Sequence, residues 1–434
     1  MKNHLKSLIS LMLVACLLFG STAFAQPIEL SVKTDVFAKL SVASFGAQRV
    51  TLKAGAASKD GASLQWNSVK SATGYYILRS ASANGTYNKI GASSKPSYID
   101  KSAKVNVKYY YKVCAYKKTN GKIEKTNLSN AAYAYRRLAA PASVKLAKGY
   151  KRVVLSWKKV SGASYYQIYR ATSKNGKFTH FKNSRSDFAI DDSIKTGKTY
   201  YYKVRAVYKK DDQLYLGVFA GQKAGAGVKI DPKKPVIAIT FDDGPGKNST
   251  KRILNVLEKY GCRATFFTVG SMVKDGQPTQ NLIRERNMGC EIANHSYNHP
   301  AMTKLTDKEI KAQFSKTNSI VKKATGITPK LARLPYGSNN SRVLAAMEMP
   351  CIQWCIDTED WKSHNPDKIY SQVVGKVKDG DIVLFHDIHD TTATAIEKII
   401  PKLVSQGYQI VTVSELAEIK GTKLKAGKLY FNIK

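Results

Sequence analysis

The stretch "VIAITFDDGPGKNSTKRIL", Val236 to Leu254, joins an apolar run to two adjacent aspartates, a turn and a helical pattern. The run up to Phe241 has the length and composition of a buried strand, and Asp242 and Asp243 follow at its end. From "TKRIL" onward, apolar residues recur with helical spacing. A buried strand that passes through a turn into a helix is the start of a β/α unit, and its carboxyl end is where such folds carry their chemistry.

The chain after this stretch alternates between strand-like and helix-like segments. We predict strands over 236–241, 264–269, 290–295, 331–336, 352–357, 381–386 and 408–413, and helical patterns include 250–261, 306–326, 367–380 and 392–407. Strict alternation implies parallel β/α units that close as a barrel or lie as an open sheet. The predicted strand ends carry Asp242, Asp243, His295, Arg333 to Tyr336, Asp357 and His386. These five ends are expected to face one pocket.

The region before this stretch contains a duplication. The segment "LQWNSVKSATGYYILRSASANGTY" includes Trp66 and the segment "LSWKKVSGASYYQIYRATSKNGKF" includes Trp157, 91 positions later. Short alternating segments rich in β-branched and aromatic residues are typical of an antiparallel sandwich. The early Trp and the late "YYYKVCAY" and "TYYYKVRAVY" segments resemble fibronectin type III modules. We expect their tyrosines to pack the cores of spacer modules, with binding of a glycan or wall polymer as the alternative.

The N-terminus has the pattern of an export signal. Lys2 and Lys6 precede an apolar run from Leu8 to Gly20, and Ala23-Phe24-Ala25 forms a small-x-small cleavage site before Gln26. A lipoprotein box ending at Cys16 is the alternative, and the apolar residues beyond it argue against that interpretation. No other stretch approaches the ~20 apolar residues that span a bilayer. The sequence therefore predicts a protein that is secreted, extracellular or associated with the cell wall.

The charge of the chain predicts a polyanionic neighbourhood. Its 434 residues include 70 Lys and Arg against 31 Asp and Glu, a formal net charge of +39. No nucleic-acid-binding motif appears, and an exported protein does not meet nucleic acid as its usual partner. Anionic polymers of a cell envelope are the expected partners. Basic charge that serves only solubility is the alternative.

Cysteine usage does not describe a disulfide scaffold. Removal of the signal leaves Cys114, Cys262, Cys290, Cys351 and Cys355, an odd number in a long chain. Cys355 lies in an apolar strand-like run, where we expect it to be a small buried hydrophobic residue. A bridge between Cys262 and Cys290 stays open.

A metal site is indicated by two motifs at the predicted strand ends. "NHSYNHP" places His295 and His299 four positions apart, which is predicted to set both imidazoles on one side of a helical turn. Two histidines and one carboxylate form a three-ligand site with positions left for water and substrate. One aspartate of the pair Asp242 and Asp243 is then free to act as a base. Either motif alone is more typical of an ordinary turn or helix face.

Together these residues resemble the polysaccharide deacetylases with a NodB-type domain, carbohydrate esterase family 4. Five motifs appear in the order of that family: Thr240-Phe241-Asp242-Asp243-Gly244-Pro245, His295-Ser296-Tyr297-Asn298-His299, Arg333-Leu334-Pro335-Tyr336, Asp357-Thr358-Glu359-Asp360-Trp361 and Leu384-Phe385-His386. The resemblance implies a distorted (β/α) barrel that binds one divalent ion, usually zinc. We predict a signal peptide over 1–25, a linker over 26–45, fibronectin type III-like domains over 46–137 and 138–220, a linker over 221–235 and the catalytic domain over 236–434.

The resemblance also implies roles for individual residues. Asp243, His295 and His299 would hold the metal, and Asp242 would act as the general base, oriented by Arg333. The backbone N–H of Tyr336 would stabilise the oxyanion, and His386 would protonate the leaving amine with its pKa raised by Asp360. The expected substrate-binding residues are Pro335, Trp361 and Leu384.

The implied function is hydrolysis of N-acetyl groups on N-acetylglucosamine residues of an envelope glycan, above all peptidoglycan. The alternatives within this chemistry are deacetylation of chitin or chito-oligosaccharides and O-deacetylation of acetylated xylan. Two alternatives come from other classes: a wall-binding protein without catalysis, which the intact motifs disfavour, and a non-haem iron oxygenase.

Overall fold

The computed structural model describes residues 44–53 and 60–434. The predicted signal peptide over 1–25, the lipoprotein alternative at Cys16 and nearly all of the predicted linker over 26–45 lie outside the described residues. Within the described part of the chain, no helix combines the length and the apolar character needed to cross a bilayer.

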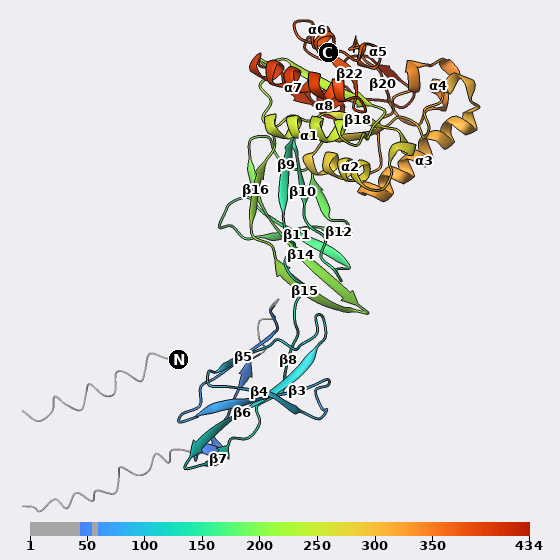
Figure 1. Ribbon diagram of the computed structural model, residues 1–434. Coiled ribbons are helices and arrows are strands. Elements are labelled where there is room, and N and C mark those ends of the chain that lie inside the picture. Colours follow the sequence, from blue (N-terminus) through green and yellow to red (C-terminus); the bar gives the residue numbers. More distant parts are fainter. Residues whose placement is uncertain (1–43, 54–59) are drawn as a thin grey trace, which may run out of the picture.

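The first sheet-rich unit packs a three-stranded sheet against a five-stranded one (Figure 1). Its three-stranded sheet has the order β1-β2-β5, and its larger sheet has the order β4-β3-β6-β7 with β8 also paired to β6. All of these pairings are antiparallel. The strands are β1 (Leu52–Lys53), β2 (Ala62–Trp66), β3 (Gly74–Ser80), β4 (Asn88–Ser93), β5 (Ser97–Asp100), β6 (Tyr109–Thr119), β7 (Lys122–Lys125) and β8 (Ala132–Ala134).

The second unit repeats this plan. Its sheets have the orders β13-β10-β9 and β12-β11-β14-β15, with β16 also paired to β14. The strands are β9 (Lys145–Gly149), β10 (Arg152–Ser156), β11 (Tyr165–Ala171), β12 (Thr179–Ser184), β13 (Phe188–Asp191), β14 (Thr199–Lys210), β15 (Gln213–Phe219) and β16 (Lys223–Ala226). The predicted linker over 221–235 is therefore wrong in its first part, because β16 forms a strand of this sandwich through backbone pairing that its Gly and Lys content did not indicate.

A buried ion pair recurs in both units at equivalent positions. In the first unit Asp100 accepts from Nη1 of Arg79 at 2.8 Å and from the Tyr111 hydroxyl at 2.9 Å. In the second, the corresponding bonds to Asp191 measure 2.8 and 2.7 Å. The duplication seen in the sequence thus preserves three-dimensional contacts.

The C-terminal unit is built on parallel strands covered by helices. Its main sheet has the order β19-β18-β17-β22-β21, with β23 paired to β17. The strands are β17 (Val236–Asp242), β18 (Thr265–Thr268), β19 (Glu291–Asn294), β20 (Cys351–Ile352), β21 (Ile356–Asp357), β22 (Ile382–His386), β23 (Gln409–Val411) and β24 (Leu429–Tyr430). The α-helices are α1 (Ser249–Tyr260), α2 (Gln277–Met288), α3 (Asp307–Thr325), α4 (Ser341–Ala346), α5 (Asp360–Ser363), α6 (Pro366–Val373), α7 (Asp390–Ser405) and α8 (Val413–Ile419).

Strand β17 is buried along its whole length, which explains its unbroken apolar run. Ile237 and Ile239 pack in one apolar cluster with residues of α1 and α7, whereas Ala238 packs in a second cluster with residues of α8. A parallel strand covered on both faces has no polar side to alternate with. Packing on both faces of β17 therefore holds the end of the strand, which carries Asp242, in the centre of the unit.

Two predicted strands are shorter in the structure than the sequence indicated. Residues 331–336 form only single bridges at Ala332, which pairs with Asn294 and Cys351, and then a 3-10 turn over Pro335–Gly337. Residues 352–357 are split between β20 and β21. Cys355, between these two, is exposed, which contradicts the expected buried position, and all five described cysteines are free thiols.

Glu415 joins the second sandwich to the C-terminal unit. It caps α8, and its carboxylate also accepts from Nε of Arg263 at 2.9 Å and from the backbone N–H of Tyr150 at 2.7 Å. Arg263 in turn donates to the carbonyl of Lys148 at 2.9 Å. A second contact pairs Arg286 with Asp187 at 3.2 Å. Since Arg263 and Glu415 are 3% and 6% exposed, the contact excludes water from both charges.

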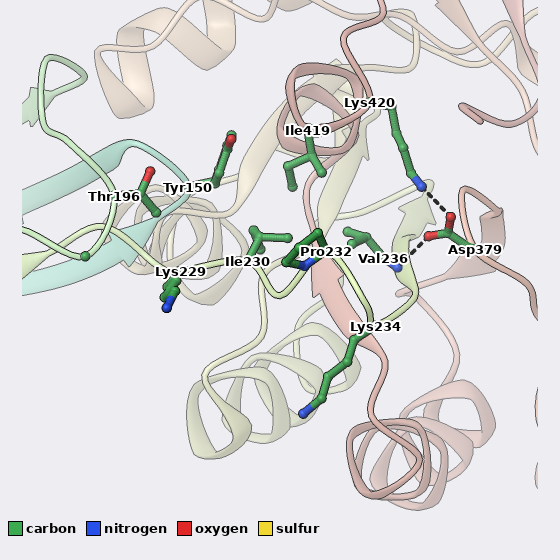
Figure 2. Close-up of a pocket in the computed structure, with 11 residues that line it drawn as sticks. Tyr150, Thr196, Lys229, Ile230, Pro232, Lys234, Val236, Asp379, Ile419 and Lys420 are labelled. Atoms are coloured by element: carbon green, nitrogen blue, oxygen red, sulfur yellow. Dashed lines mark hydrogen bonds and ion pairs between the residues drawn. The ribbon is translucent and has the colours of Figure 1, made fainter.

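Figure 2 shows a pocket beside this contact, at the amino end of β17. Here Oδ1 of Asp379 accepts from the backbone N–H of Val236 at 2.8 Å, and Lys420 pairs with the same carboxylate. Lys229 and Lys234 also line the pocket. The carboxylate of Asp379 therefore fixes the start of the strand that carries Asp242 at its other end.

We predict that Glu285→Gln stabilises the protein at neutral pH. Glu285 on α2 is 1% exposed, and neither of its carboxylate oxygens has a hydrogen-bond partner among the described residues. Burial raises its pKa well above the usual value, and the nearby charge of Asp387 raises it further. The pKa of Glu285 is higher in the folded than in the unfolded state. The loss of folding stability that this causes is therefore absent below about pH 4.3, where both states are protonated, and it grows as pH rises.

The midpoint of thermal unfolding should therefore rise in Glu285→Gln at pH 7 by at least about 2–4 °C, the shift that about 1 kcal/mol produces in a domain of this size. The gain should vanish at pH 4. Glu348→Gln, at an exposed position, is the control and should leave the midpoint unchanged. An equal gain at both pH values would indicate a packing effect and contradict the explanation.

Candidate metal centre and active-site cleft

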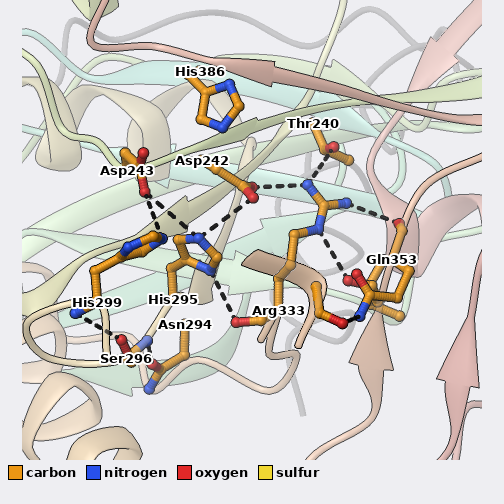
Figure 3. Close-up of polar contacts among 12 residues, drawn as sticks. Thr240, Asp242, Asp243, Asn294, His295, Ser296, His299, Arg333, Gln353 and His386 are labelled. Carbon is orange, nitrogen blue, oxygen red and sulfur yellow. Dashed lines mark hydrogen bonds and ion pairs between the residues drawn. The ribbon is translucent and has the colours of Figure 1, made fainter. Parts of the chain in front are cut away.

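The carboxyl ends of β17 and β19 bring three potential metal ligands together (Figure 3). Oδ1 of Asp243 lies 3.5 Å from Nε2 of His295 and 3.3 Å from Nε2 of His299. One donor atom from each residue lies within 4.8 Å of the other two. The structure thus brings together the three residues that the sequence singled out as a ligand set.

The two histidines do not lie on a helical turn, so that part of the prediction is wrong. His295 follows β19 and His299 lies in the loop after it, with left-handed backbone at Ser296 and at His299 (φ 68° and 61°). The loop is held by the backbone N–H of His299, which donates to Oγ of Ser296 at 3.1 Å. Backbone strain of this kind is common at functional sites. The tight loop thus brings the imidazoles of His295 and His299 together, as the helical turn predicted from their four-residue spacing would have done.

The donor set suits a divalent metal such as zinc. Nδ1 of His295 is bonded to the backbone carbonyl of Arg333 at 2.9 Å, which leaves its Nε2 as the free ligand atom. Burial lowers the pKa of His295 to about 3, more than the charge of Asp243 raises it, so the imidazole is neutral as ligation requires. Oδ1 of Asp243 is buried and has no hydrogen-bond partner among the described residues. Two imidazole nitrogens and one carboxylate oxygen form a familiar zinc set.

Asp242 is held by a fully buried arginine. Nη1 of Arg333 donates to Oδ1 of Asp242 at 2.7 Å and to Oγ1 of Thr240 at 2.8 Å. Its Nε and Nη2 donate to the carbonyls of Ile352 and Gln353 at 2.9 and 3.0 Å. Burial raises the pKa of Asp242 and the charge of Arg333 opposes that rise. The other carboxylate oxygen, Oδ2, lies 3.5 Å from Nε2 of His295 and faces the metal ligands.

His386 forms a second charged pair across the cleft from these ligands. Its Nδ1 lies 2.7 Å from Oδ1 of Asp360, whose Oδ2 accepts from the backbone N–H of His386 and from the Thr392 hydroxyl, each at 2.7 Å. Burial lowers the pKa of His386, but the hydrogen bond to Asp360 and the charges of Asp360, Asp242 and Asp243 together outweigh it, and the result is a pKa of about 9. The imidazole is therefore protonated at neutral pH, with Nε2 as its free ring nitrogen.

These groups surround a cleft of about 400 Å³. Its lining residues are Asp242, Asp243, His295, His299, Leu334, Tyr336, Trp354, Asp357, Trp361, Leu384 and His386. Of the predicted substrate-binding residues, Trp361 and Leu384 line the cleft, whereas Pro335 is buried and does not. Arg333 and Asp360 act from behind Asp242 and His386.

Trp354 also forms a wall of the cleft, although none of the motifs in the sequence indicated it. Trp354 stands between β20 and β21, and a Cβ on Gly337 would lie 3.2 Å from its ring. Tyr336, 71% exposed, packs edge-on against His299 with ring centroids 4.5 Å apart, and Trp361 is 51% exposed. A tryptophan just before the predicted strand end at Asp357 was the available signal. The cleft thus has a charged floor and aromatic walls, a composition that suits a sugar ring.

Comparison with known proteins finds relatives of the C-terminal unit. The family model described as "Polysaccharide deacetylase" matches residues 229–350. Peptidoglycan-N-acetylmuramic acid deacetylase PdaC of Bacillus subtilis (strain 168) is 45% identical over 191 residues, covering 44% of this chain and 40% of that protein. A peptidoglycan-N-acetylglucosamine deacetylase of Bacillus cereus is 34% identical over 201 residues, covering 44% of this chain and 92% of that protein.

A solved structure of the peptidoglycan deacetylase PdaC from Bacillus subtilis is also similar, at 44% sequence identity with a TM-score of 0.43; the match covers 44% of this chain and 94% of that one. The chain spans about two fifths of the length of the first of these curated relatives.

We predict that Arg333→Met strongly destabilises the C-terminal unit. The change leaves the carboxylate of Asp242 buried without its partner, which typically costs about 3–5 kcal/mol. The double variant Arg333→Met/Asp242→Asn should recover part of this loss, because no unpaired charge remains. Urea unfolding followed by tryptophan fluorescence measures both. Equal stabilities of the single and double variants would contradict a charge-based cost.

Proposed function

Since this chain belongs to the polysaccharide deacetylase family, we propose that it removes acetyl groups from N-acetylglucosamine residues of peptidoglycan, as a secreted, metal-dependent amidohydrolase. The observation that carries this proposal is the cleft in which a base held by Arg333, a three-residue ligand set and a protonated His386 all meet. Metal-assisted hydrolysis of an amide uses a base for the water, a cation for the carbonyl and an acid for the leaving amine, and this cleft offers residues for each.

Asp243, His295 and His299 are the residues that would hold the ion, which we propose is zinc. When bound, a divalent cation supplies an acidified water, with its pKa lowered from about 15.7 toward about 7, and polarisation of the acetyl carbonyl. Asp242 then accepts the water's proton. Its Oδ1 accepts from Arg333, whereas its Oδ2 faces the metal ligands, so we propose Oδ2 as the accepting atom.

His386 is the group that releases the amine. The leaving nitrogen departs only if it receives a proton, and the ion pair with Asp360 keeps that proton on the imidazole at neutral pH. The backbone N–H of Tyr336 is our proposed donor to the oxyanion. Leu384 and Trp361 offer apolar surface for the acetyl methyl group, and the exposed ring of Tyr336 offers a wall for the sugar.

The choice of peptidoglycan rests on relatives whose names specify it. Because one of them is named for N-acetylmuramic acid, the position of the removed acetyl group on the glycan is part of what must be measured. Acetylated xylan is the second candidate, since a relative from Pseudobutyrivibrio xylanivorans, 40% identical over 224 residues, is named a bifunctional xylanase/deacetylase.

The finer features of the architecture belong to the same proposal. We take the C-terminal unit to be a distorted (β/α) barrel and the two sheet-rich units to be fibronectin type III-like spacers. The basic charge of the chain would hold the protein near anionic cell-wall polymers. Export through the signal pattern at 1–25 would bring it to its substrate.

We predict acetate release from purified peptidoglycan that is abolished by a chelator and restored by zinc. Asp242→Asn should reduce the rate by roughly 10²–10⁴-fold, because it removes the general base while keeping the shape of the side chain. Asp367→Asn, which removes an exposed carboxylate on α6, should have no effect and serves as the control.

The experiment runs both with and without oxygen on peptidoglycan, chitopentaose and acetylated xylan, followed by mass spectrometry of the products. No release from peptidoglycan by a protein that binds zinc would refute the proposed substrate. Release from xylan alone would establish the O-acetyl esterase instead. A requirement for oxygen would indicate the oxygenase alternative, and silence on all three polymers would favour a non-catalytic binding protein.

We predict that Asp360→Asn shifts the alkaline limb of the pH profile. In the wild type, kcat/KM should fall as pH rises through about 9, because His386 loses the proton that the leaving amine needs. Without the carboxylate the limb should move about 1–3 pH units lower. Thr392→Val removes only one hydrogen bond to Asp360 and should move it less. An unchanged limb in Asp360→Asn would mean that another group is the acid.

A further inference from the structure

The outer face of the large sheet of the first sandwich carries tyrosines and lysines. Directly paired residues of neighbouring strands share a face, and Tyr76 pairs with Cys114, Tyr110 with Tyr133 and Tyr116 with Lys125. The alternate residues, such as Tyr75, Ile77, Tyr111 and Val113, are buried in the core. We call the outward set the tyrosine–lysine face: Tyr76, Tyr110, Tyr116, Tyr133, Lys89, Lys108, Lys112 and Lys125.

The rings and ammonium groups of this face form two clusters. In the first, Tyr76 and Tyr116 stack with centroids 4.3 Å apart and planes 16° apart, and Nζ of Lys89 lies 3.7 Å from the centroid of Tyr76. In the second, Nζ of Lys108 lies 4.1 Å from the centroid of Tyr133 and 5.2 Å from that of Tyr110. Each cluster thus sets a cation beside flat aromatic surface.

No carboxylate in the described part of the chain forms an ion pair with these lysines. The strands contribute no Asp or Glu to this face: Glu124 pairs in register with Lys117 on the opposite side and accepts from the backbone N–H of Gly46. Asp100 is buried in its pair with Arg79. Among the described residues, no ion pair involves the four lysines of the face. Their charge is therefore available to an external anion.

At the equivalent place in the second sandwich lies an arginine, and it is hydrogen-bonded to neighbouring side chains of the same sheet. The position of Tyr76 is taken by Gln167 and that of Cys114 by Arg205, and these two are paired in register. Nε of Arg205 donates to Oε1 of Gln167 at 2.9 Å, and Nη2 donates to the Tyr169 hydroxyl at 2.8 Å.

Of the four lysines of the face, Lys112 has a counterpart in the second sandwich, Lys203, which also lies over an aromatic ring. The positions of Lys89, Lys108 and Lys125 are taken there by His180, Thr199 and Leu216. These three lysines are therefore specific to the first copy and are not required by the duplicated fold.

We propose that the tyrosine–lysine face binds a linear, carboxylate-bearing polysaccharide. The tyrosine rings would contact the apolar faces of successive sugars, and the lysines would pair with the carboxylates between them. A polysaccharide is favoured over other polyanions because the C-terminal unit belongs to a family that acts on polysaccharides. The inference goes beyond the proposed deacetylation and does not depend on it.

The test measures binding of a galacturonate oligosaccharide to the full chain by calorimetry. This probe bears a carboxylate on every sugar and no acetamide, so the catalytic cleft has nothing to hydrolyse. The triple variant Lys89→Gln/Lys108→Gln/Lys125→Gln should raise Kd at least about tenfold, a change of about 1.4 kcal/mol. The control is the triple variant Lys53→Gln/Lys70→Gln/Lys95→Gln, which removes the same charge elsewhere on the first sandwich. It should change Kd by less than about twofold, because exposed charges that do not contact the ligand contribute little.

A second variant tests the aromatic contribution. Tyr133 is 49% exposed, so Tyr133→Ala should fold normally, which its thermal unfolding midpoint checks. It should weaken galacturonate binding but leave binding of inorganic polyphosphate, which has no sugar rings, unchanged. Equal weakening for both probes would overturn the proposed ring contact.

Three results would overturn the proposal as a whole: no binding of the galacturonate probe, equal losses in the two lysine triple variants, or an oligothymidylate that binds as tightly as the glycan. The last would assign the face to single-stranded nucleic acid. The catalytically impaired Asp242→Asn variant should bind the probe as the wild type does. Failure of this inference is thereby separated from failure of the proposed function.

Discussion

The buried pair of Arg333 and Asp242 is the interaction on which the C-terminal unit depends. A charge removed from water is tolerated only with a complete set of partners, and Arg333 finds them on β17 and on the segment around β20. The same guanidinium that orients Asp242, our proposed base, therefore also ties together strands far apart in sequence. Stability and chemistry share one side chain, so neither can change without the other.

The positions of the catalytic groups were largely predictable, because parallel strands deliver their carboxyl ends to one place. Apolar runs locate those ends to within a residue or two, as β17 and β22 illustrate. The path of the loop between His295 and His299 was not predictable. Two left-handed residues produce it, and neither is a glycine that would have announced the turn.

Two other features were not predicted correctly, for a different reason. The linker after the second sandwich was predicted to start too early, and Trp354 was not predicted to line the cleft. The composition of strand β16 is typical of a linker, and only its backbone pairing with β14 makes it a strand. Trp354 and the exposed Cys355 lie where a predicted strand breaks into two pieces, so a strict alternation of faces does not apply. Both features depend on long-range partners that local composition does not encode.

The carboxylate of Glu415 limits how the C-terminal unit can be combined with other domains. The matches to this unit cover 40% of one relative and 92% of another, so similar units occur in proteins of different total length. In this chain, however, the unit shares a buried charge with its neighbour, since Glu415 caps its own helix and also binds Tyr150 of the second sandwich. Recombination at the boundary would expose Arg263 and Glu415 together. An exchange that keeps the second sandwich attached to the C-terminal unit would leave both charges buried.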